Sequence, residues 1–459
     1  MLDRNSTLRQ ERPIVGEVPR RRTRQRRAGR RSTASAVAVA VAASLGLAAC
    51  GGGDSSGSTP TLTYYINPDS SGASQEAAAA CTKESGGKYR LAIAVLPATA
   101  DGQREQLVRR LAAKDTSVDI MIVDPPYTPE LANAGWLRSF SSAERAVLLK
   151  DILKAPIESA TWKDELIAAP YSANTQLLWY RKSVAQKAGV DPTSPSFTWD
   201  QMIDAAIKTG TTVEEQGNKY EGYMVWVNAM VLGAGGTILS NNDRGRDATV
   251  SIDSPAGRRA AQIIRKLATS KAANPALSTA LEENGANAFN GPNGGFMLNW
   301  PFVYARAQTQ VKKRALAQSV LDDTAWARYP RVEVNIPSRP PLGGANLAIS
   351  KFSKYPDQAV AAVQCLMQPA KQKIRILGLG DPVTNGTVYD DPEVRKKYPF
   401  ASLMRESINA AGSRPVTPFY GDVSGSIQRE WHPPAAVTTA TPKKSASLIG
   451  DVLHDRRLL

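Results

Sequence analysis

The chain is poor in the residues that build metal centres and catalytic triads. Its 459 residues include only three cysteines and two histidines, His432 and His454, both near the C-terminus. A triad or a His-rich metal site would have to form at that one end, and three cysteines cannot supply a disulfide scaffold or a zinc site of the CxxC type. We therefore expect no resident metal, no cofactor and no catalytic triad.

Acidic residues are fewer than basic ones, and more than half of this difference lies in one short segment. The chain has 57 Lys and Arg against 42 Asp and Glu, a net charge of +15. Residues 1–31, with eleven arginines, carry +8 of this charge, and residues 32–49 carry none. A basic segment followed by an apolar one is typical of an export signal. The rival interpretation is an uncleaved membrane helix, which about 20 apolar residues can form.

A cysteine at the end of the apolar segment favours the export signal. Residues 47–50 (LAAC) resemble a bacterial lipobox, in which Cys50 is acylated and becomes the first residue of the mature protein. The sequence therefore predicts a lipoprotein signal peptide at 1–49, a Gly- and Ser-rich tether at 50–60, and a lipid anchor at the extracellular face of the cell membrane. Arg30 and Arg31 leave open whether export follows the general or the twin-arginine route.

Two cysteines then remain in the mature chain, and an exported protein meets an oxidising environment. Cys81 and Cys365 form an even pair, so we expect a disulfide bond between them. The alternative is two buried thiols.

Length and residue pattern indicate an α/β fold with two lobes. A single hydrophobic core stops growing at roughly 250–300 residues, and 42% of the residues are hydrophobic, as in globular proteins. Expected strands at 61–66, 88–96 and 118–123 alternate with expected helices at 74–84 and 103–114, the second capped by Asp101. This alternation predicts right-handed crossovers and a parallel sheet covered by helices.

Polar residues follow two of these strands, at the edge of the sheet where ligands bind. Asp69 follows the first strand, and Asp124 follows the third, directly before two prolines. In parallel sheets the ligand lies beyond the carboxyl ends of the strands, so both carboxylates are candidates for ligand contact. The alternative is that each Asp simply caps the next helix.

The second part of the mature chain adds aromatic and polar candidates. Trp300 precedes a proline, which disfavours a helical conformation and puts the indole at a strand end or turn. An indole face suits the apolar side of a pyranose ring. Asn174, Arg414 and a carboxylate such as Glu282 or Glu283 can exchange hydrogen bonds with sugar hydroxyls. The alternative is a core Trp with solvated charges around it.

Eight short segments of the mature chain carry a family likeness: 135–137 (GWL), 174–181 (NTQLLWYR), 198–200 (TWD), 235–239 (GGTIL), 250–257 (VSIDSPAG), 299–302 (NWPF), 343–348 (GGANLA) and 414–418 (RPVTP). Together they resemble the extracellular solute-binding proteins of ABC importers, in particular the maltose- and trehalose-binding group. The likeness is greatest to the trehalose-binding lipoproteins of actinobacteria.

The resemblance implies a two-lobe, periplasmic-binding-protein-like (type II) α/β fold. Its lobes would close on a ligand about hinge crossovers near positions 170, 338 and 388. The implied limits are 61–170 with 338–388 for lobe I, and 171–337 with 389–459 for lobe II.

The implied function is the capture of a disaccharide, most of all trehalose, for delivery to the permease subunits of an ABC importer. The protein would act as a monomer and would catalyse no reaction. The resemblance also supports the disulfide between Cys81 and Cys365.

Carried over position by position, the resemblance puts one set of residues in the sugar site: Asp124, Asn174, Glu283, Trp300, Gly344 and Arg414. Glu282 remains an alternative to Glu283, because the length of the chain differs by one residue nearby. In the first-strand loop the Asp of the relatives falls near Ser70 or Ser71, and Asp69 is our candidate to replace it. Met297 stands where the relatives have a Glu.

Two other function classes remain as alternatives. A secreted carbohydrate-active hydrolase would need two acidic residues about 5–10 Å apart across a bound sugar. A nucleic-acid binder would show an affinity that falls steeply with salt, but most of the positive charge that suggests it lies in the expected signal peptide. We expect no nucleic-acid partner.

Overall fold

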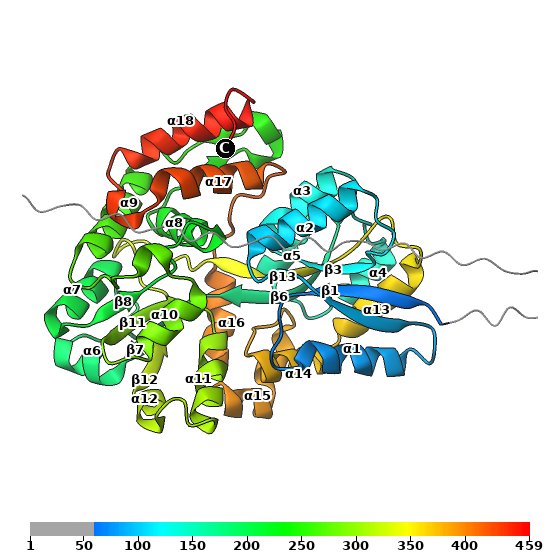
Figure 1. The fold of residues 1–459 in the computed structure, drawn as a ribbon, viewed down its shortest axis with the longest axis horizontal. Helices are drawn as coiled ribbons and strands as arrows, with labels where there is room; N and C mark the ends of the chain where they lie inside the picture. Colours follow the sequence, from blue (N-terminus) through cyan, green and yellow to red (C-terminus); the bar gives the residue numbers. More distant parts are fainter. Residues whose placement is uncertain (1–58) are drawn as a thin grey trace, which may run out of the picture. The chain divides into compact units, whose positions relative to one another are not determined.

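The computed structural model describes residues 59–459, which contain two β-sheets with helices packed around each (Figure 1). The expected signal peptide, Cys50 and nearly all of the expected tether lie outside the described residues. We call the part built on the five-stranded sheet the first lobe and the part built on the four-stranded sheet the second lobe. Within residues 59–459, no helix combines the length and the apolar character that crossing a bilayer requires.

The first lobe is built on a five-stranded sheet. Its strands, in spatial order, are β2 (Arg90–Val95), β1 (Thr61–Ile66), β3 (Ile120–Val123), β13 (Leu342–Ile349) and β6 (Ala169–Thr175). The first three strands are parallel, as the alternation of strands and helices predicts. β13 returns from late in the chain and pairs antiparallel with both β3 and β6. The sheet is therefore mixed, and its late strand lies directly beside the strand that precedes Asp124.

The second lobe is built on a four-stranded sheet. Its strands, in spatial order, are β12 (Thr324–Ala327), β7 (Leu177–Arg181), β11 (Gly294–Asn299) and β8 (Thr212–Glu214). β11 pairs antiparallel with β7 and parallel with β8. Two small ribbons complete the strands: β4 (Thr161–Trp162) with β5 (Glu165–Leu166), and β9 (Leu239–Ser240) with β10 (Thr249–Val250).

Helices cover both sheets. Those that follow strands of the first lobe are α1 (Ala73–Glu84), α2 (Ala100–Ala112), η1 (Pro125–Tyr127), α3 (Thr128–Asn133), α4 (Ser142–Leu148), α5 (Lys154–Ser159), α13 (Pro356–Leu366) and α14 (Pro369–Leu379). Those of the second part are α6 (Lys182–Ala188), α7 (Trp199–Thr209), α8 (Glu221–Gly233), η2 (Asn242–Asp247), α9 (Pro255–Thr269), η3 (Leu277–Thr279), α10 (Glu282–Phe289), α11 (Phe302–Lys312) and α12 (Gln318–Asp322). The C-terminal part holds η4 (Gly386–Asp390), α15 (Pro392–Lys397), α16 (Ala401–Ala410), α17 (Tyr420–Trp431), η5 (Pro434–Ala436) and α18 (Thr441–Leu453).

The chain passes from the first sheet to the second between β6 and β7, and returns between β12 and β13. β6 stays in the first sheet as far as Thr175, beyond the crossing expected near 170. The reason is its pairing with β13, which holds it in the first sheet as far as Thr175, so that a single residue separates it from β7. Apart from this first crossing, which lies at the end of β6, the lobe limits given above stay a proposal.

Local capping rules explain where several helices begin. Thr198 caps α7 through a capping box with Gln201, and Ser254 caps α9 ahead of a proline in its first turn. The expectation that Asp101 caps α2 is wrong, because Thr99 is the N-cap and accepts the N–H of Gly102. Asp101 lies in the first turn of α2, where its carboxylate is free to contact other parts of the molecule.

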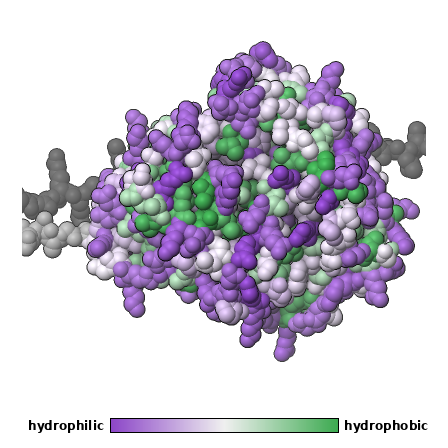
Figure 2. Space-filling view, turned by 180° about the vertical axis from the view of Figure 1, so that it is seen from behind, coloured by the Kyte–Doolittle hydropathy of each residue, from purple (hydrophilic) through white to green (hydrophobic). Residues whose placement is uncertain are grey.

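Most large apolar side chains are buried. Seen from behind, the surface is mainly hydrophilic, with apolar residues gathered in a few areas between polar ones (Figure 2). The exposed large apolar residues within 59–459 are Val95, Val147, Ile207, Val334, Tyr355, Leu458 and Leu459.

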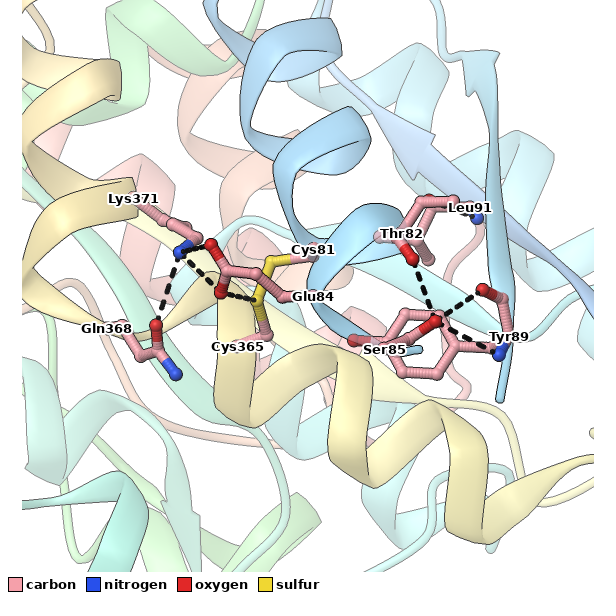
Figure 3. The surroundings of a disulfide bond; sticks show 9 residues. All are labelled: Cys81, Thr82, Glu84, Ser85, Tyr89, Leu91, Cys365, Gln368 and Lys371. Carbon is pink, nitrogen blue, oxygen red and sulfur yellow. Dashed lines mark hydrogen bonds and ion pairs between the residues drawn. A yellow bond between two sulfur atoms is a disulfide. The ribbon is translucent and has the colours of Figure 1, made fainter. Parts of the chain in front are cut away.

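A disulfide bond joins the two ends of the first lobe's sequence. Cys81 of α1 and Cys365 of α13 lie 5.8 Å apart between Cα atoms and are bonded, although they are 284 positions apart in sequence (Figure 3). Beside the bond, Lys371 of α14 contacts the carboxylate of Glu84 at 2.5 Å. The cross-link therefore fixes an early helix against a late one, and both helices pack against each other.

We predict that replacing both cysteines by serine lowers the free energy of unfolding by about 2–5 kcal/mol, because the bond restricts the unfolded chain over a long loop. Urea denaturation of the double variant beside the oxidised wild type measures the difference. Reduced wild type is the matched control and should behave like the variant. Equal stability of the oxidised protein and the variant would show that the bond is absent in solution.

Candidate functional site

An ion pair between the two lobes brings together two of the residues predicted for ligand contact. Asp124 follows β3, and Arg414 lies in the segment between α16 and α17. Nη2 of Arg414 is 2.6 Å from Oδ1 of Asp124, and Nη1 is 3.4 Å from Oδ2. The side chain of Arg414 is almost fully buried, with 2% of its area exposed, and that of Asp124 has 17% exposed. Burial raises the pKa of Asp124, and the attraction of Arg414 offsets this only in part.

A second carboxylate, Glu221, holds Arg414 from the other side. Oε1 of Glu221 is 2.6 Å from Nη1 of Arg414 and also accepts a hydrogen bond from the hydroxyl of Tyr420. Oε2 accepts a hydrogen bond from Ser424 at 2.6 Å. Burial raises the pKa of Glu221 to about 7. The nearby carboxylates also raise this pKa, and the attraction of Arg414 lowers it by a smaller amount.

Asn174 of β6 belongs to a second polar cluster. Its Nδ2 donates to Oδ1 of Asp381 at 2.9 Å, and its Oδ1 accepts the backbone N–H of Thr175. The other oxygen of Asp381 lies 2.5 Å from Nη2 of Arg375, whose guanidinium lies over the ring of Tyr171 at 4.9 Å. The amide of Asn174 is therefore held in one orientation by a buried ion pair.

Trp300 lies at a strand end, where the proline rule places it. It follows β11 directly, and its backbone N–H donates to Oδ1 of Asn299 at 2.8 Å. Its ring lies over β13, since a Cβ atom on Gly343 would come within 2.9 Å of two ring atoms. Gly343 is paired with Asn174 across the sheet, so the indole of the second lobe lies beside the polar cluster of the first.

The conformation of the backbone at position 344 requires a glycine. Its φ of +117° lies in the region that favours glycine, and a Cβ atom would come within 2.1 Å of the carbonyl oxygen of Ser172. The close approach of β13 to β6 therefore depends on this residue, whatever it contacts in a ligand.

Asp69 forms hydrogen bonds at the start of a helix, as the alternative to ligand contact predicts. Oδ1 accepts the N–H groups of Ser71 and Gly72, and Oδ2 accepts that of Ser74, at the start of α1. Burial acts to raise its pKa, but the hydrogen bonds from Ser71 and Ser74 outweigh this and lower it. Both oxygens are thus engaged with the backbone of their own loop.

The two glutamates of α10 point in different directions. Glu283 is exposed and pairs with Arg306 of α11 at 2.5 Å. The carboxyl of Glu282 lies by Tyr220 in the interior, where burial raises its pKa. Its backbone carbonyl accepts a hydrogen bond from Asn299, the neighbour of Trp300. Of the two candidates, Glu282 is therefore the one that lies near the other predicted residues.

Sequence reasoning missed Glu221, Asp381 and Arg375. Glu221 carried a signal, because it is the one charged residue in the mainly apolar helix α8. Asp381 precedes a proline as Asp124 does, which is a similar signal. Arg375 carried none, because it is one of several basic residues on α14.

Of the predicted residues, Asp124 and Arg414 contact each other directly, and Trp300 lies against β13. Two cavities, of about 440 and 710 Å³, lie elsewhere in the second part of the chain, one beside α16 and segment 337–340 and the other beside α11 and α12. The lobes thus meet directly through Asp124, Arg414 and Trp300.

A match to the family described as bacterial extracellular solute-binding protein covers residues 69–373, about two thirds of the chain. The chain belongs to this family. The solute-binding protein is 26% identical over 421 residues to a probable ABC transporter-binding protein of Deinococcus radiodurans, covering 88% of this chain and 94% of that one.

Solved structures share the two-lobe α/β fold of the solute-binding protein. The maltose-bound MalE3 protein of T. maritima has a TM-score of 0.75 at 23% identity, over 86% of this chain and 100% of that one. The GacH receptor of Streptomyces glaucescens has a TM-score of 0.71 at 21% identity, over 86% and 98%. The expected type II fold is confirmed, and the protein is a solute-binding protein and not an enzyme.

The raised pKa of Glu221 generates a prediction on stability. A carboxyl whose pKa is near 7 when folded and near 4.5 when unfolded binds its proton more tightly in the folded state. Its contribution to stability is therefore present below about pH 4.5 and is lost as the pH rises to about 7, a change on the order of 3 kcal/mol. We expect Glu221→Gln, which cannot titrate, to gain stability relative to wild type between pH 5 and pH 8. Urea denaturation across this range measures the difference, and a constant difference would contradict the assignment.

Proposed function

We propose that this solute-binding protein captures a neutral disaccharide, with trehalose as its favoured ligand, and delivers it to the permease of an ABC importer. The observation that carries the proposal is the meeting, at the junction of the lobes, of one indole plane with polar side chains from both lobes. The indole is that of Trp300, and the polar groups are those of Asp124, Asn174 and Arg414.

The charges at the junction support an uncharged, hydroxyl-rich ligand. The carboxylates of Asp124, Glu221 and Asp381 stand against the guanidinium groups of Arg375 and Arg414, and each guanidinium is already paired. An anionic solute such as a phosphate ester would meet an excess of negative charge. Hydroxyl groups, in contrast, can donate to carboxylates and accept from the amide and the guanidinium.

The fold neighbours support the sugar class. The T. maritima neighbour is described as maltose-bound, and the GacH receptor was solved in complex with acarbose. The choice of trehalose rests on the sequence resemblance, above all on the segments that contain Asn174, Trp300, Gly344 and Arg414.

In the proposed complex, Asp124 contacts the sugar from the first lobe, and Trp300, Arg414 and Glu282 from the second. Asn174 and Gly344 lie at the junction. We also propose that Cys50 carries a lipid anchor, that the protein lies at the extracellular face of the membrane, and that it is a monomer with the lobe limits given above. Asp69 we now assign to the start of α1, where its hydrogen bonds are.

We predict that Trp300→Ala abolishes trehalose binding in calorimetry, a loss on the order of 100-fold or more, because the sugar loses its only stacking plane among these residues. Its melting temperature should stay within a few degrees of wild type. Trp162→Ala, on the small β4–β5 ribbon, is the matched control and should bind normally. A thermal-shift screen over trehalose, maltose, oligosaccharides, polyols and glycerol 3-phosphate tests the ligand class. Wild-type affinity in Trp300→Ala would refute the site.

The two glutamates of α10 can be told apart by the same assay. We expect Glu282→Gln to weaken trehalose binding by about tenfold, as the loss of a charged hydrogen-bond acceptor does. Glu283→Gln should bind like wild type, because that side chain is exposed and paired with Arg306. The reverse result would return the ligand role to Glu283.

A further inference from the structure

A contact surface away from Trp300 joins the two lobes along helices α2, α8 and α17. In Figure 1 α2 lies beside α8 and α17, and η1 of the first lobe contacts α17 of the second. We call this surface the seam and define it by Asp101, Asp124 and Tyr127 of the first lobe and Glu221, Arg414 and Tyr420 of the second. Asp101 and Glu221 have no part in the proposed sugar contacts, so their positions call for another explanation.

Asp101 contacts the N-terminus of a helix that belongs to the other lobe. Its Oδ2 accepts the backbone N–H of Glu221, the first residue of α8, at 3.0 Å. α8 spans 13 residues and has no side-chain cap of its own, since its N-cap residue is Tyr220. The first N–H groups of a helix need partners and carry partial positive charge. The first lobe therefore supplies the cap that the second lobe lacks.

Aromatic and basic contacts close the rest of the seam. The rings of Tyr127 and Tyr420 meet edge to face, with centroids 5.3 Å apart. The hydroxyl of Tyr127 lies 3.0 Å from Asp101 and 3.3 Å from Glu221. Arg104 of α2, paired with Glu130 at 2.5 Å, lies against Gly421, where a Cβ atom would come within 3.1 Å of the guanidinium.

Glu221 determines where Arg414 points. Three of its partners, Arg414, Tyr420 and Ser424, belong to its own lobe, so these contacts persist when the lobes separate. With Nη1 held by Glu221, Nη2 of Arg414 faces the first lobe and Asp124. The guanidinium is thus shared between the lobes: Nη2 contacts Asp124, and Nη1 contacts Glu221 at 2.6 Å and Asp124 at 3.4 Å.

We propose that the seam is a latch for lobe closure, in which Glu221 is a positioning residue that aims Arg414 at the first lobe and Asp101 is a docking residue that caps α8. The ion pair between Asp124 and Arg414 completes the latch. The proposal rests on the proposed function only where closure is linked to sugar affinity, since the latch itself needs no ligand.

The latch is balanced rather than permanent. Three carboxylates, those of Asp101, Asp124 and Glu221, gather around the single cation Arg414, and their mutual repulsion and loss of hydration oppose closure. The cap and the ion pair favour it. A ligand that touches both lobes can therefore shift the equilibrium with a modest difference in affinity.

The same cluster links closure to protons. Glu221 faces Asp101, Asp124 and Tyr127 from the first lobe and Arg414, Tyr420 and Ser424 from the second. When the lobes separate, the two first-lobe carboxylates withdraw and water enters, so the pKa of Glu221 falls. The closed form then binds the proton more tightly, and a lower pH favours closure.

The test measures closure without sugar. Small-angle scattering reports the dimensions of the protein, and hydrogen exchange reports the peptide 218–228 at the start of α8. We expect Asp101→Ala, which removes the cap of α8, and Glu221→Ala, which no longer aims Arg414, to enlarge the sugar-free protein and to speed exchange in this peptide about 2- to 10-fold. Asp115→Asn, whose ion pair with Arg110 stays within the first lobe, is the matched control and should change neither.

The pH profile separates a latch from a merely structural role. From pH 8 to pH 6 the wild type should become more compact, and Glu221→Gln should show no such change. Wild-type scattering and exchange in both alanine variants would overturn the latch, as would a compaction of Glu221→Gln from pH 8 to pH 6 equal to that of the wild type. Should Glu221→Ala fail to fold, Asp101→Ala, on a half-buried side chain, decides the matter by the same measurements.

The affinity for trehalose distinguishes this proposal from the proposed function. We expect both alanine variants to bind trehalose about 2- to 10-fold more weakly, because closure contributes to affinity. Open variants together with a wild type that binds no trehalose would support the latch and refute the ligand. Variants that bind trehalose normally and stay closed would support the ligand and refute the latch.

Discussion

One guanidinium shared by two lobes is the constraint on which the arrangement of this protein depends. Arg414 is buried, so its charge needs carboxylates close by, and these come from the residue after β3 in one lobe and from α8 in the other. The backbone follows from that need: the segment after α16 returns to the junction, and the N-terminus of α8 faces α2. Separating the lobes leaves half of the cation without its partner.

The junction combines this electrostatic constraint with a steric one. Trp300 can lie against β13 because position 343 has no side chain, and Gly344 allows β13 to approach β6. The strand that carries these glycines lies directly between β3 and β6. Hence the same late strand places the aromatic plane, the amide of Asn174 and the carboxylate of Asp124 within one region of the solute-binding protein.

The local parts of this structure could be predicted from the sequence, and the long-range parts could not. β1, α1 and the cap at Thr198 follow from alternation and capping within a few residues. Asp101 was misassigned because its partner is 120 residues away, so no local pattern records it. Glu282 and Glu283 differ by one position, roughly 100° around a helix, and only the packed structure shows which one faces inward.

The position of β1 has a mechanical consequence. The strand begins at Thr61 and lies between β2 and β3, with the cross-linked α1 directly after it. A pull on the segment that precedes it would load hydrogen bonds on both edges of the strand in shear, many at once, rather than peel an edge strand bond by bond. Beyond Cys81 the disulfide passes the force to α13. Such a pull would therefore act on the first lobe, and the second lobe would be free to move without tension.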